Sequence, residues 1–288
     1  MRRVALEHTA SKHLWSMSMK TPPNPFKQAL QQKTPQVGLW LSLVHPDAAE
    51  IAGLAGFDWL VVDGEHAPYD LQSIKTQLQV LAAYPNSHPV VRVPVGDTAL
   101  IKQFLDVGVR NLLVPMVDTP EQAAQLVQAC RYPQADGQGG VRGMAGARAS
   151  RWGHFEDYFT AANAHICLIV QAESLQALQN LDAIAATPGV DGVFLGPADL
   201  SAAMGWVGQP AHPKVQAAIE DGIQRILKAG KAAGVIATDE ALARRYLACG
   251  ASFVAVGVDA LLLMRASRDL AARFKGAVSA SNGSGGSY

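Results

Sequence analysis

Seven polar side chains lie at or just after the ends of four short apolar runs in this sequence. They comprise four carboxylates, one histidine, one arginine and one amide: Asp63, Glu65, Glu173, Asp199, His66, Arg92 and Gln171. Carboxylates gathered in one place repel one another unless a cation lies among them. We expect Glu173 and Asp199 to bind a hard divalent ion, and oxygen ligands favour Mg²⁺ or Mn²⁺ over zinc.

The same set of groups suits the making and quenching of an enolate. A metal ion could polarise a carbonyl group, while His66 moves a proton and Arg92 holds developing negative charge. Asp63 lies three residues before His66. It could fix the tautomer of the imidazole, as the orienting carboxylate of a general base does.

Each of these residues also has a plain structural explanation. Asp199 could cap the helix that follows it, and Glu173 could be a first-turn residue favoured by the helix dipole. Arg92 could belong to a structural ion pair, and His66 could be a hydrogen-bonded structural histidine. Their coincidence at the ends of several strands favours the chemical interpretation.

The elements that position these residues follow from the hydrophobic pattern. Short continuous apolar runs alternate with stretches of helical period, which is typical of parallel strands buried on both faces. Eight such units in 288 residues predict an α/β fold, a single-domain (β/α)₈ or TIM barrel with its chemistry at the carboxyl ends of the strands. A doubly wound open sheet is the alternative. The eight runs are 37–43, 59–62, 90–93, 112–117, 166–170, 192–195, 234–237 and 253–256.

Capping signals and helical faces mark the intervening helices. Thr119 with Gln122, and Pro120 between them, predict a helix start of the capping-box type. The segment from His45 to Asp47 predicts another, with proline at the first helical position. Two apolar faces are expected, formed by Leu175, Leu178, Leu181 and Ile184, and by Val215, Ile219, Ile223 and Ile226.

Composition excludes several classes of protein. The 24 basic and 24 acidic residues balance, so nucleic-acid binding, which depends on an excess of positive charge, is disfavoured. No apolar run reaches the roughly 18 residues of a membrane span. Three widely spaced cysteines in apolar stretches favour buried thiols and a cytoplasmic protein. We expect an N-terminal extension over 1–24, disordered or mis-started, a barrel over 25–276 and a flexible Gly/Ser-rich tail over 277–288.

A long connection and the placement of the lysines complete the survey. The Gly- and Arg-rich segment 135–153 is long for an ordinary loop, so it is either a functional flap or an oligomer contact. The lysines that we considered for Schiff-base chemistry fall on helical stretches rather than at strand ends, which disfavours covalent imine catalysis. They are Lys75, Lys102, Lys214, Lys228, Lys231 and Lys275.

Several motifs resemble one enzyme family over about 25–274. They are VDGEHAP, PVVRVP, GVRG, ARASRW, QAES, GVDGVFLGPADLSAAMG and FVAVGVDALLL. Together they are similar to the metal-dependent (class II) pyruvate aldolases of the family named for 4-hydroxy-2-oxoheptanedioate aldolase. The Asp-Gly-Glu-His segment combined with Gly-Pro-Ala-Asp-Leu-Ser is the most specific part of this resemblance.

The resemblance implies an activity and an assembly. The activity is reversible cleavage of 4-hydroxy-2-oxoheptane-1,7-dioate to pyruvate and succinic semialdehyde through a pyruvate enolate, with Mg²⁺, Mn²⁺ or Co²⁺ as cofactor. The partners are small 2-oxo acids and aldehydes, with neither nucleic acid nor membrane. The assembly is a homo-oligomer, a hexamer built as a trimer of dimers that swap the last barrel helix.

The resemblance also implies a role for each matching residue. Glu173 and Asp199 are the metal ligands, His66 is the proton acceptor oriented by Asp63, and Arg92 stabilises the transition state. Substrate binding falls to Gln171, Arg92 and the Ala198-Asp199 backbone. Glu65 touches water beside the metal, and Asp106 raises the basicity of the histidine.

Three other functions compete with this interpretation. An aldolase of the same family could act on 2-keto-3-deoxy sugar acids, such as rhamnonate or glucarate products. A lyase for a CoA thioester or a phosphonate could use the same enolate chemistry, with Arg142, Arg148 and Arg151 as the available basic approach. A non-enzymatic binding barrel is disfavoured by the joint presence of the metal-ligand and proton-transfer groups.

Overall fold

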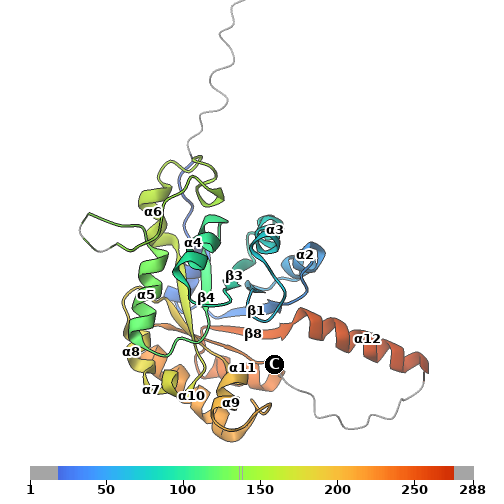
Figure 1. The fold of residues 1–288 in the computed structure, drawn as a ribbon. Coiled ribbons are helices and arrows are strands. Elements are labelled where there is room, and N and C mark those ends of the chain that lie inside the picture. The colour runs from blue at the N-terminus through green and yellow to red at the C-terminus, as the bar shows by residue number, and fades with distance from the viewer. Residues whose placement is uncertain (1–18, 136, 138, 276–288) are drawn as a thin grey trace, which may run out of the picture.

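Eight parallel strands close into a barrel. The computed structural model describes residues 19–135, 137 and 139–275, and its strands pair in sequence order from β1 to β8 (Figure 1). Because β1 also pairs with β8, the predicted (β/α)₈ barrel is confirmed and the open sheet is excluded. The strands are β1 (Gln36–Leu41), β2 (Trp59–Asp63), β3 (His88–Arg92), β4 (Asn111–Val114), β5 (Cys167–Ala172), β6 (Gly192–Leu195), β7 (Ala232–Ile236) and β8 (Phe253–Val258).

Most of the helices lie around the outside of the barrel (Figure 1). They separate consecutive strands, as the alternating sequence pattern predicts. Their bounds are α1 (Pro25–Gln31), α2 (Pro46–Leu54), α3 (Leu71–Leu81), α4 (Thr98–Asp106), α5 (Pro120–Cys130), the 3-10 helix η1 (Arg148–Ser150), α6 (Tyr158–His165), α7 (Leu175–Gln179), α8 (Leu181–Ala186), α9 (Pro197–Ala203), α10 (Pro213–Lys228), α11 (Glu240–Ala248) and α12 (Asp259–Lys275).

The predicted helix starts are present, whereas one predicted helix is divided. Thr119 and Gln122 form the capping box of α5, and His45 caps α2. The single face expected over 175–184 is instead two short helices that meet at Asn180. The Asn180 side chain donates a hydrogen bond to the Asp118 carbonyl. Such a side-chain contact with the backbone competes with helix continuation.

The side chains that point into the barrel form a core of their own. Alternate residues of a strand face the same side, and Trp59, Val61 and their counterparts on the other strands make this inner cluster. Glycines provide the space that its aromatic rings occupy. A Cβ atom at Gly38 would lie 2.3 Å from the Trp59 ring, and one at Gly234 would lie 2.2 Å from the Phe253 ring.

The amino-end rim, where the strands begin, is closed by α1. The Phe26 ring lies 5.9 Å from Trp59 and 6.1 Å from Phe253, and both partners are the first residues of their strands. Asn24 caps α1 and donates to Asn111 Oδ1 at 2.8 Å. Contacts with the barrel therefore begin before residue 25, where we placed the boundary. Residues 1–18 and the predicted tail lie outside the described residues.

The opposite, carboxyl-end rim receives the polar residues that continue the inward alternation. On β2, Trp59 and Val61 are followed two residues later by Asp63. Arg92 ends β3 in register with Asp63, and Gln171 lies two residues beyond Ile169 on β5. The period of two therefore turns three buried polar side chains toward the axis of the barrel.

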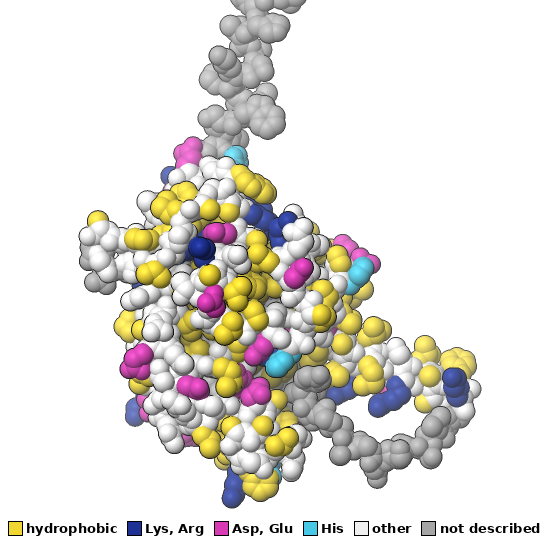
Figure 2. Space-filling view, in the orientation of Figure 1, with side chains coloured by type: hydrophobic (Ala, Val, Ile, Leu, Met, Phe, Trp, Pro, Cys, Tyr) yellow, Lys and Arg dark blue, Asp and Glu magenta, His cyan; other side chains and the backbone are white. Residues whose placement is uncertain are grey.

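The last helix, α12, projects away from the barrel instead of packing along it (Figure 1). None of its residues is buried, and Leu263 and Phe274 are among its exposed apolar side chains. Figure 2 shows apolar and basic side chains side by side along this projection. Among the helices within 19–275, none combines the length and hydrophobicity needed to cross a bilayer.

Candidate active site

A cavity of about 570 Å³ opens at the carboxyl-end rim. Six of the residues predicted from the sequence line it: Asp63, His66, Arg92, Gln171, Ala198 and Asp199. The rest of its wall is largely apolar and comes from β1, β6, β7, β8 and the first turns of α12: Trp40, Ser42, Phe194, Gly196, Pro197, Ile236, Val258, Ala260, Leu261 and Met264.

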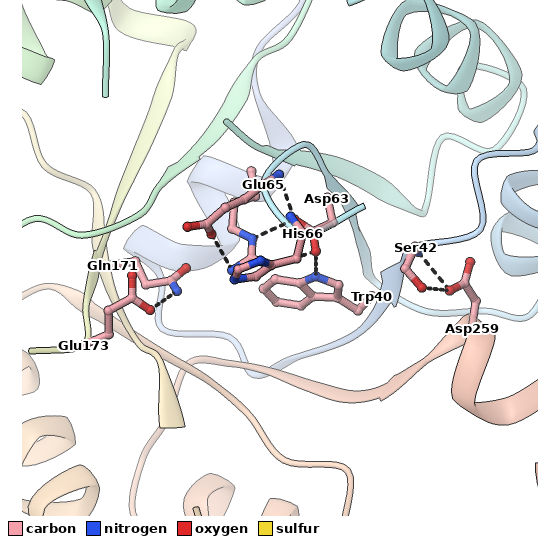
Figure 3. A network of polar contacts seen from close by, with 9 residues as sticks. Trp40, Ser42, Asp63, Glu65, His66, Gln171, Glu173 and Asp259 are labelled. Atoms are coloured by element: carbon pink, nitrogen blue, oxygen red, sulfur yellow. Dashed lines mark hydrogen bonds and ion pairs between the residues drawn. The ribbon is translucent and has the colours of Figure 1, made fainter. Parts of the chain in front are cut away.

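Arg92 lies between two carboxylates, those of Asp63 and Glu65, which Figure 3 labels. Its Nε donates to Asp63 Oδ1 at 2.8 Å and its Nη2 donates to Asp63 Oδ2 at 2.7 Å. Its Nη1 forms an ion pair with Glu65 Oε2 at 2.7 Å. Burial acts to raise the pKa of Asp63, but the hydrogen bonds and charge of Arg92 outweigh it and hold that pKa below its usual value. Arg92 is thus also the structural partner that we considered as an alternative.

Trp40 completes this cluster, and sequence reasoning missed it. Its indole Nε1 donates to Asp63 Oδ2 at 2.9 Å, and the Arg92 guanidinium lies 4.9 Å from the ring centroid. A tryptophan inside an apolar run is usually a core residue, so the sequence around Trp40 gave no sign of a functional role. Its inward position near the end of β1 is the feature that could have identified it.

His66 lies at the mouth of the cavity, and its contact with Asp63 differs from the expected one. The His66 backbone N–H donates to Asp63 Oδ1 at 3.3 Å, and the Glu65 N–H donates to the same oxygen at 3.1 Å. Asp63 therefore fixes the turn that presents His66. The expected hydrogen bond to the imidazole is absent between these two described residues, because Arg92, Trp40 and two backbone amides occupy the carboxylate.

Glu173 lies deeper, beside Gln171, and is almost completely buried. Its Oε1 accepts from the Met116 backbone N–H at 2.9 Å, and Gln171 donates to its Oε2. Burial, with smaller contributions from the charges of Asp199 and Glu65, raises the pKa of Glu173 to about 7 despite these hydrogen bonds. Glu173 precedes Ser174, the cap of α7, so it is not the first-turn helix residue of the structural alternative.

Asp199 lies in the first turn of α9 without capping it. The helix follows Gly196, and the cap position makes no side-chain hydrogen bond. Gly196 is required here, because a Cβ atom would lie 2.3 Å from Glu173 Oε2 and 3.1 Å from Gln171 Nε2. The glycine therefore keeps space open next to the buried carboxylate and on the wall of the cavity.

These groups fit a divalent cation. Within the described residues, no three His, Cys, Asp or Glu side chains converge as a complete ligand set. The protein would supply the carboxylates of Glu173 and Asp199, and water or substrate would fill the other positions. Gln171 Oε1 is buried and accepts no hydrogen bond within the described part of the chain. A buried carboxylate beside other negative charges is stabilised by a cation.

Asp106 does not reach this cavity in the chain. It ends α4, which runs back from the end of β3 toward the amino-end rim, and its Oδ1 accepts from Arg142 Nη2 at 3.1 Å. It is not among the residues of the cavity wall. Within one chain, Asp106 therefore does not contact His66, the contact that the resemblance implies. The reason is that α4 carries the Asp106 side chain to the opposite rim.

The glycine- and arginine-rich segment is also placed away from the cavity. None of the described residues of 135–153 lines it. Arg142 is buried against Asp106, while Arg148 and Arg151 line a separate, smaller cavity. Within one chain, the described residues of this segment therefore form no flap over this site, and Arg142, Arg148 and Arg151 provide no basic approach to it. No lysine lies on the described cavity wall either.

Comparisons with known proteins agree with the motifs. A family model described as HpcH/HpaI aldolase/citrate lyase matches residues 36–266. A hydroxypyruvate/pyruvate aldolase of Pseudomonas aeruginosa is 59% identical over 272 residues, which cover 94% of this chain and 100% of that protein. A 4-hydroxy-2-oxo-heptane-1,7-dioate aldolase of Shigella boydii is 54% identical over 253 residues, covering 87% and 95%.

Solved structures give the same result. A HpcH/HpaI aldolase/citrate lyase family protein from Burkholderia cenocepacia has a TM-score of 0.84 at 42% identity, covering 88% of this chain and 99% of that one. The resemblance drawn from the motifs is thereby confirmed. The chain belongs to the HpcH/HpaI aldolase/citrate lyase family and is a carbon-carbon lyase of the aldolase type.

Proposed function

We propose that this chain is a divalent-metal-dependent pyruvate aldolase that makes and breaks the C3–C4 bond of 4-hydroxy-2-oxo acids. The observation that supports this most is the meeting of His66, Arg92, Gln171 and Asp199 on one cavity wall, with Glu173 in contact with Gln171 behind it. Each group has one task in enolate chemistry, and the set lies at the rim where barrel enzymes place their active sites.

The metal is held by Glu173 and Asp199 in this proposal. A bound Mg²⁺, Mn²⁺ or Co²⁺ supplies a Lewis acid for the oxygens of the 2-oxo acid. Gln171 uses its amide to position the substrate, and the Ala198-Asp199 backbone borders the same space. Glu65 is ion-paired with Arg92, and in this proposal its carboxylate accepts a hydrogen bond from water at the site.

The remaining steps fall to His66 and Arg92. In the cleavage direction, His66 accepts the proton of the C4 hydroxyl group, and the C3–C4 bond breaks to release an aldehyde. The electron pair of that bond stays on the pyruvate fragment as an enolate, whose negative charge Arg92 stabilises until C3 takes up a proton. Arg92 is pre-oriented for this task, because Asp63, Glu65 and the Trp40 ring hold its guanidinium on three sides.

The shape and charge of the cavity bear on the substrate. Cleavage of 4-hydroxy-2-oxoheptane-1,7-dioate is the reaction implied by the motifs and by the name of the Shigella boydii relative. Its second carboxylate would need a cation, yet Arg92 is the single Arg or Lys of the described wall and is already paired. The apolar wall formed by Ile236, Leu261 and Met264 suits an uncharged aldehyde better. The name hydroxypyruvate/pyruvate aldolase adds hydroxypyruvate as a second donor to test.

The chain is proposed to work as a homo-oligomer, with the hexamer of swapped dimers as the expected form. The exposed apolar side chains of α12, including Leu263 and Phe274, support a partner for this helix. Ala260 and Met264 at its start also line the cavity, so its placement affects the active site. Light scattering on the purified protein should give a hexamer mass, and a monomer would refute this part.

One reaction series tests the proposed function. The Mn²⁺-loaded protein is incubated with pyruvate or hydroxypyruvate and a panel of aldehydes that includes succinic semialdehyde and propanal, and the adducts are identified. We expect 4-hydroxy-2-oxo acids in samples with Mn²⁺, none after EDTA treatment, and recovery with Mn²⁺, Co²⁺ or Mg²⁺. Full activity in metal-free protein, or no adduct with any aldehyde, would refute the proposal. Sugar-derived aldehydes in the panel separate the sugar-acid alternative.

A further inference from the structure

A second, smaller cavity lies at the amino-end rim, on the far side of the barrel from the active site. It has a volume of about 100 Å³ and lies between the starts of β4 and β5, α6 and the segment that contains η1. Three arginines and one histidine line it, and none of its described lining residues is an Asp or Glu. These four are Arg110, Arg148, Arg151 and His165.

Two of the three arginines are positioned by hydrogen bonds to backbone carbonyls, and none of the three has a carboxylate partner among the described residues. Arg110 Nη2 donates to the Pro22 carbonyl at 2.7 Å, and Arg148 Nη1 donates to the Val107 carbonyl at 2.7 Å. No carboxylate among the described residues lies within 4.0 Å of any of the three guanidinium groups. Each contact uses one nitrogen of a group that has five N–H donors, so donors remain for a ligand.

No ion pair offsets this positive charge within the described part of the chain. Arg142, from the same segment, is fully buried and has Asp106 as its partner. Asp157 accepts hydrogen bonds from the N–H and the hydroxyl of Thr21, one of the lining residues, at 2.7 and 2.9 Å, and it forms no ion pair with the three described arginines. Burial lowers the pKa of Arg148, and the charge of Arg151 lowers it further.

The backbone at Arg151 adopts an unfavourable conformation. Arg151 and Trp152 both have positive φ, 51° and 54°, in the left-handed region that non-glycine residues seldom adopt. Such conformations persist where surrounding contacts over-determine them and are found often at ligand sites. The turn directs the chain so that Arg151 joins Arg110 and Arg148 around one space.

We propose that this cavity is a binding site for a phosphate group, separate from the aldolase site. Guanidinium forks match the oxygens of a phosphate by paired, charge-assisted hydrogen bonds, and a dianion would offset the mutual repulsion of three cations. The volume has room for a small polyatomic anion but not for a nucleotide. The ligand is inorganic phosphate or the phosphate end of a small monoester that leaves the cavity toward solvent.

A thermal-shift titration of the full chain tests the site. The probes are sodium phosphate and glycerol 3-phosphate, each compared with sodium chloride at the same ionic strength. We expect phosphate to raise the unfolding temperature saturably while chloride does not. Tighter binding of the monoester would identify a phosphorylated metabolite, and tighter binding of phosphate would identify the inorganic ion.

Matched variants locate the ligand. Arg151→Gln changes the most exposed arginine of the site and should weaken phosphate binding about tenfold, the loss of one charge-assisted contact. Arg110→Gln should have a similar effect. Arg244→Gln removes the same charge from an exposed i, i+4 pair elsewhere and should leave phosphate affinity unchanged.

Two results would overturn the proposal. Equal phosphate affinity in Arg151→Gln, Arg110→Gln and Arg244→Gln would show that the shift is a general effect of charge. Loss of the phosphate response in Arg92→Gln, with the response intact in Arg151→Gln, would place the anion in the large cavity. If Arg110→Gln proves too unstable to measure, Arg151→Gln alone decides, because Arg151 is exposed and its replacement should not disturb the fold. None of these readouts depends on aldolase activity, so failure here leaves the proposed function untouched.

Discussion

The two ends of the barrel use the same inward positions for opposite purposes. At the amino-end rim, Trp59 and Phe253 fill the interior, and Phe26 from α1 seals it with further hydrocarbon. Four residues farther along β2 the inward side chain is Asp63, and the equivalent level of β3 presents Arg92. One end is thus a packed core, while the other is an open cavity whose wall includes the charged groups of Asp63, Arg92 and Asp199.

The difference shows which end of the barrel contributes stability and which end gives up stability to hold charged groups. Aromatic packing at the closed end stabilises the barrel by burying apolar area. At the open end, Arg92 is outnumbered by Asp63 and Glu65, and Glu173 adds a further buried carboxylate. Charged groups placed this way cost stability unless they are paired, so this end keeps an arrangement that favours a cation. Substitutions at the two ends should therefore separate activity from stability.

Replacing His66 should give the largest loss of turnover. His66→Ala removes the proposed proton acceptor, and general base catalysis is typically worth about 10²- to 10⁴-fold. We expect kcat for retro-aldol cleavage to fall by at least about a hundredfold, with Mn²⁺ affinity retained. An unchanged kcat would remove His66 from the mechanism.

Arg92→Lys should have the second largest effect, a loss of about a hundredfold in kcat/KM. The positive charge is kept, but a lysine ammonium cannot reproduce the paired bonds to Asp63 while also meeting Glu65. Steady-state kinetics measure the change, and Arg244→Lys on the outer surface serves as the matched control. Wild-type turnover in Arg92→Lys would show that a point charge is sufficient.

Trp40→Phe should have an intermediate effect. It keeps an aromatic ring beneath Arg92 but deletes the Nε1 donor to Asp63, and loss of such supporting hydrogen bonds typically costs about 10-fold or more. We expect kcat to fall about tenfold while Mn²⁺ affinity is kept. If kcat is unaffected, the indole serves only as a wall of the cavity.

Phe26→Ala at the closed end should leave turnover nearly unchanged. Truncating a fully buried phenylalanine leaves a void and typically costs about 3–5 kcal/mol of unfolding free energy, which urea denaturation measures. Leu54→Ala, at a side chain that is 70% exposed, is the control and should change stability little. A loss of kcat in Phe26→Ala as large as that in Trp40→Phe would break the division between the two ends.

Much of this division could be predicted from the sequence, because it depends on local pattern. Continuous apolar runs marked all eight strands, and the polar residues after them marked one rim. The remainder depends on tertiary contacts that spacing does not encode. Asn180 divides a regular apolar helix face through a hydrogen bond to Asp118. Trp40 lies in an apolar run, where a tryptophan is indistinguishable from an ordinary core residue. Asp106 matches a family motif, but its helix carries it to the opposite rim.

Binding of Mn²⁺ tests the central claim most directly. Calorimetric titration of metal-free protein should show one Mn²⁺ ion per chain in the wild type and in His66→Ala. In Glu173→Gln and Asp199→Asn, which keep the size of each side chain, affinity should fall at least about tenfold, and the double variant should bind no ion at this site. Unchanged Mn²⁺ affinity in the folded double variant would contradict a metal held by these two carboxylates.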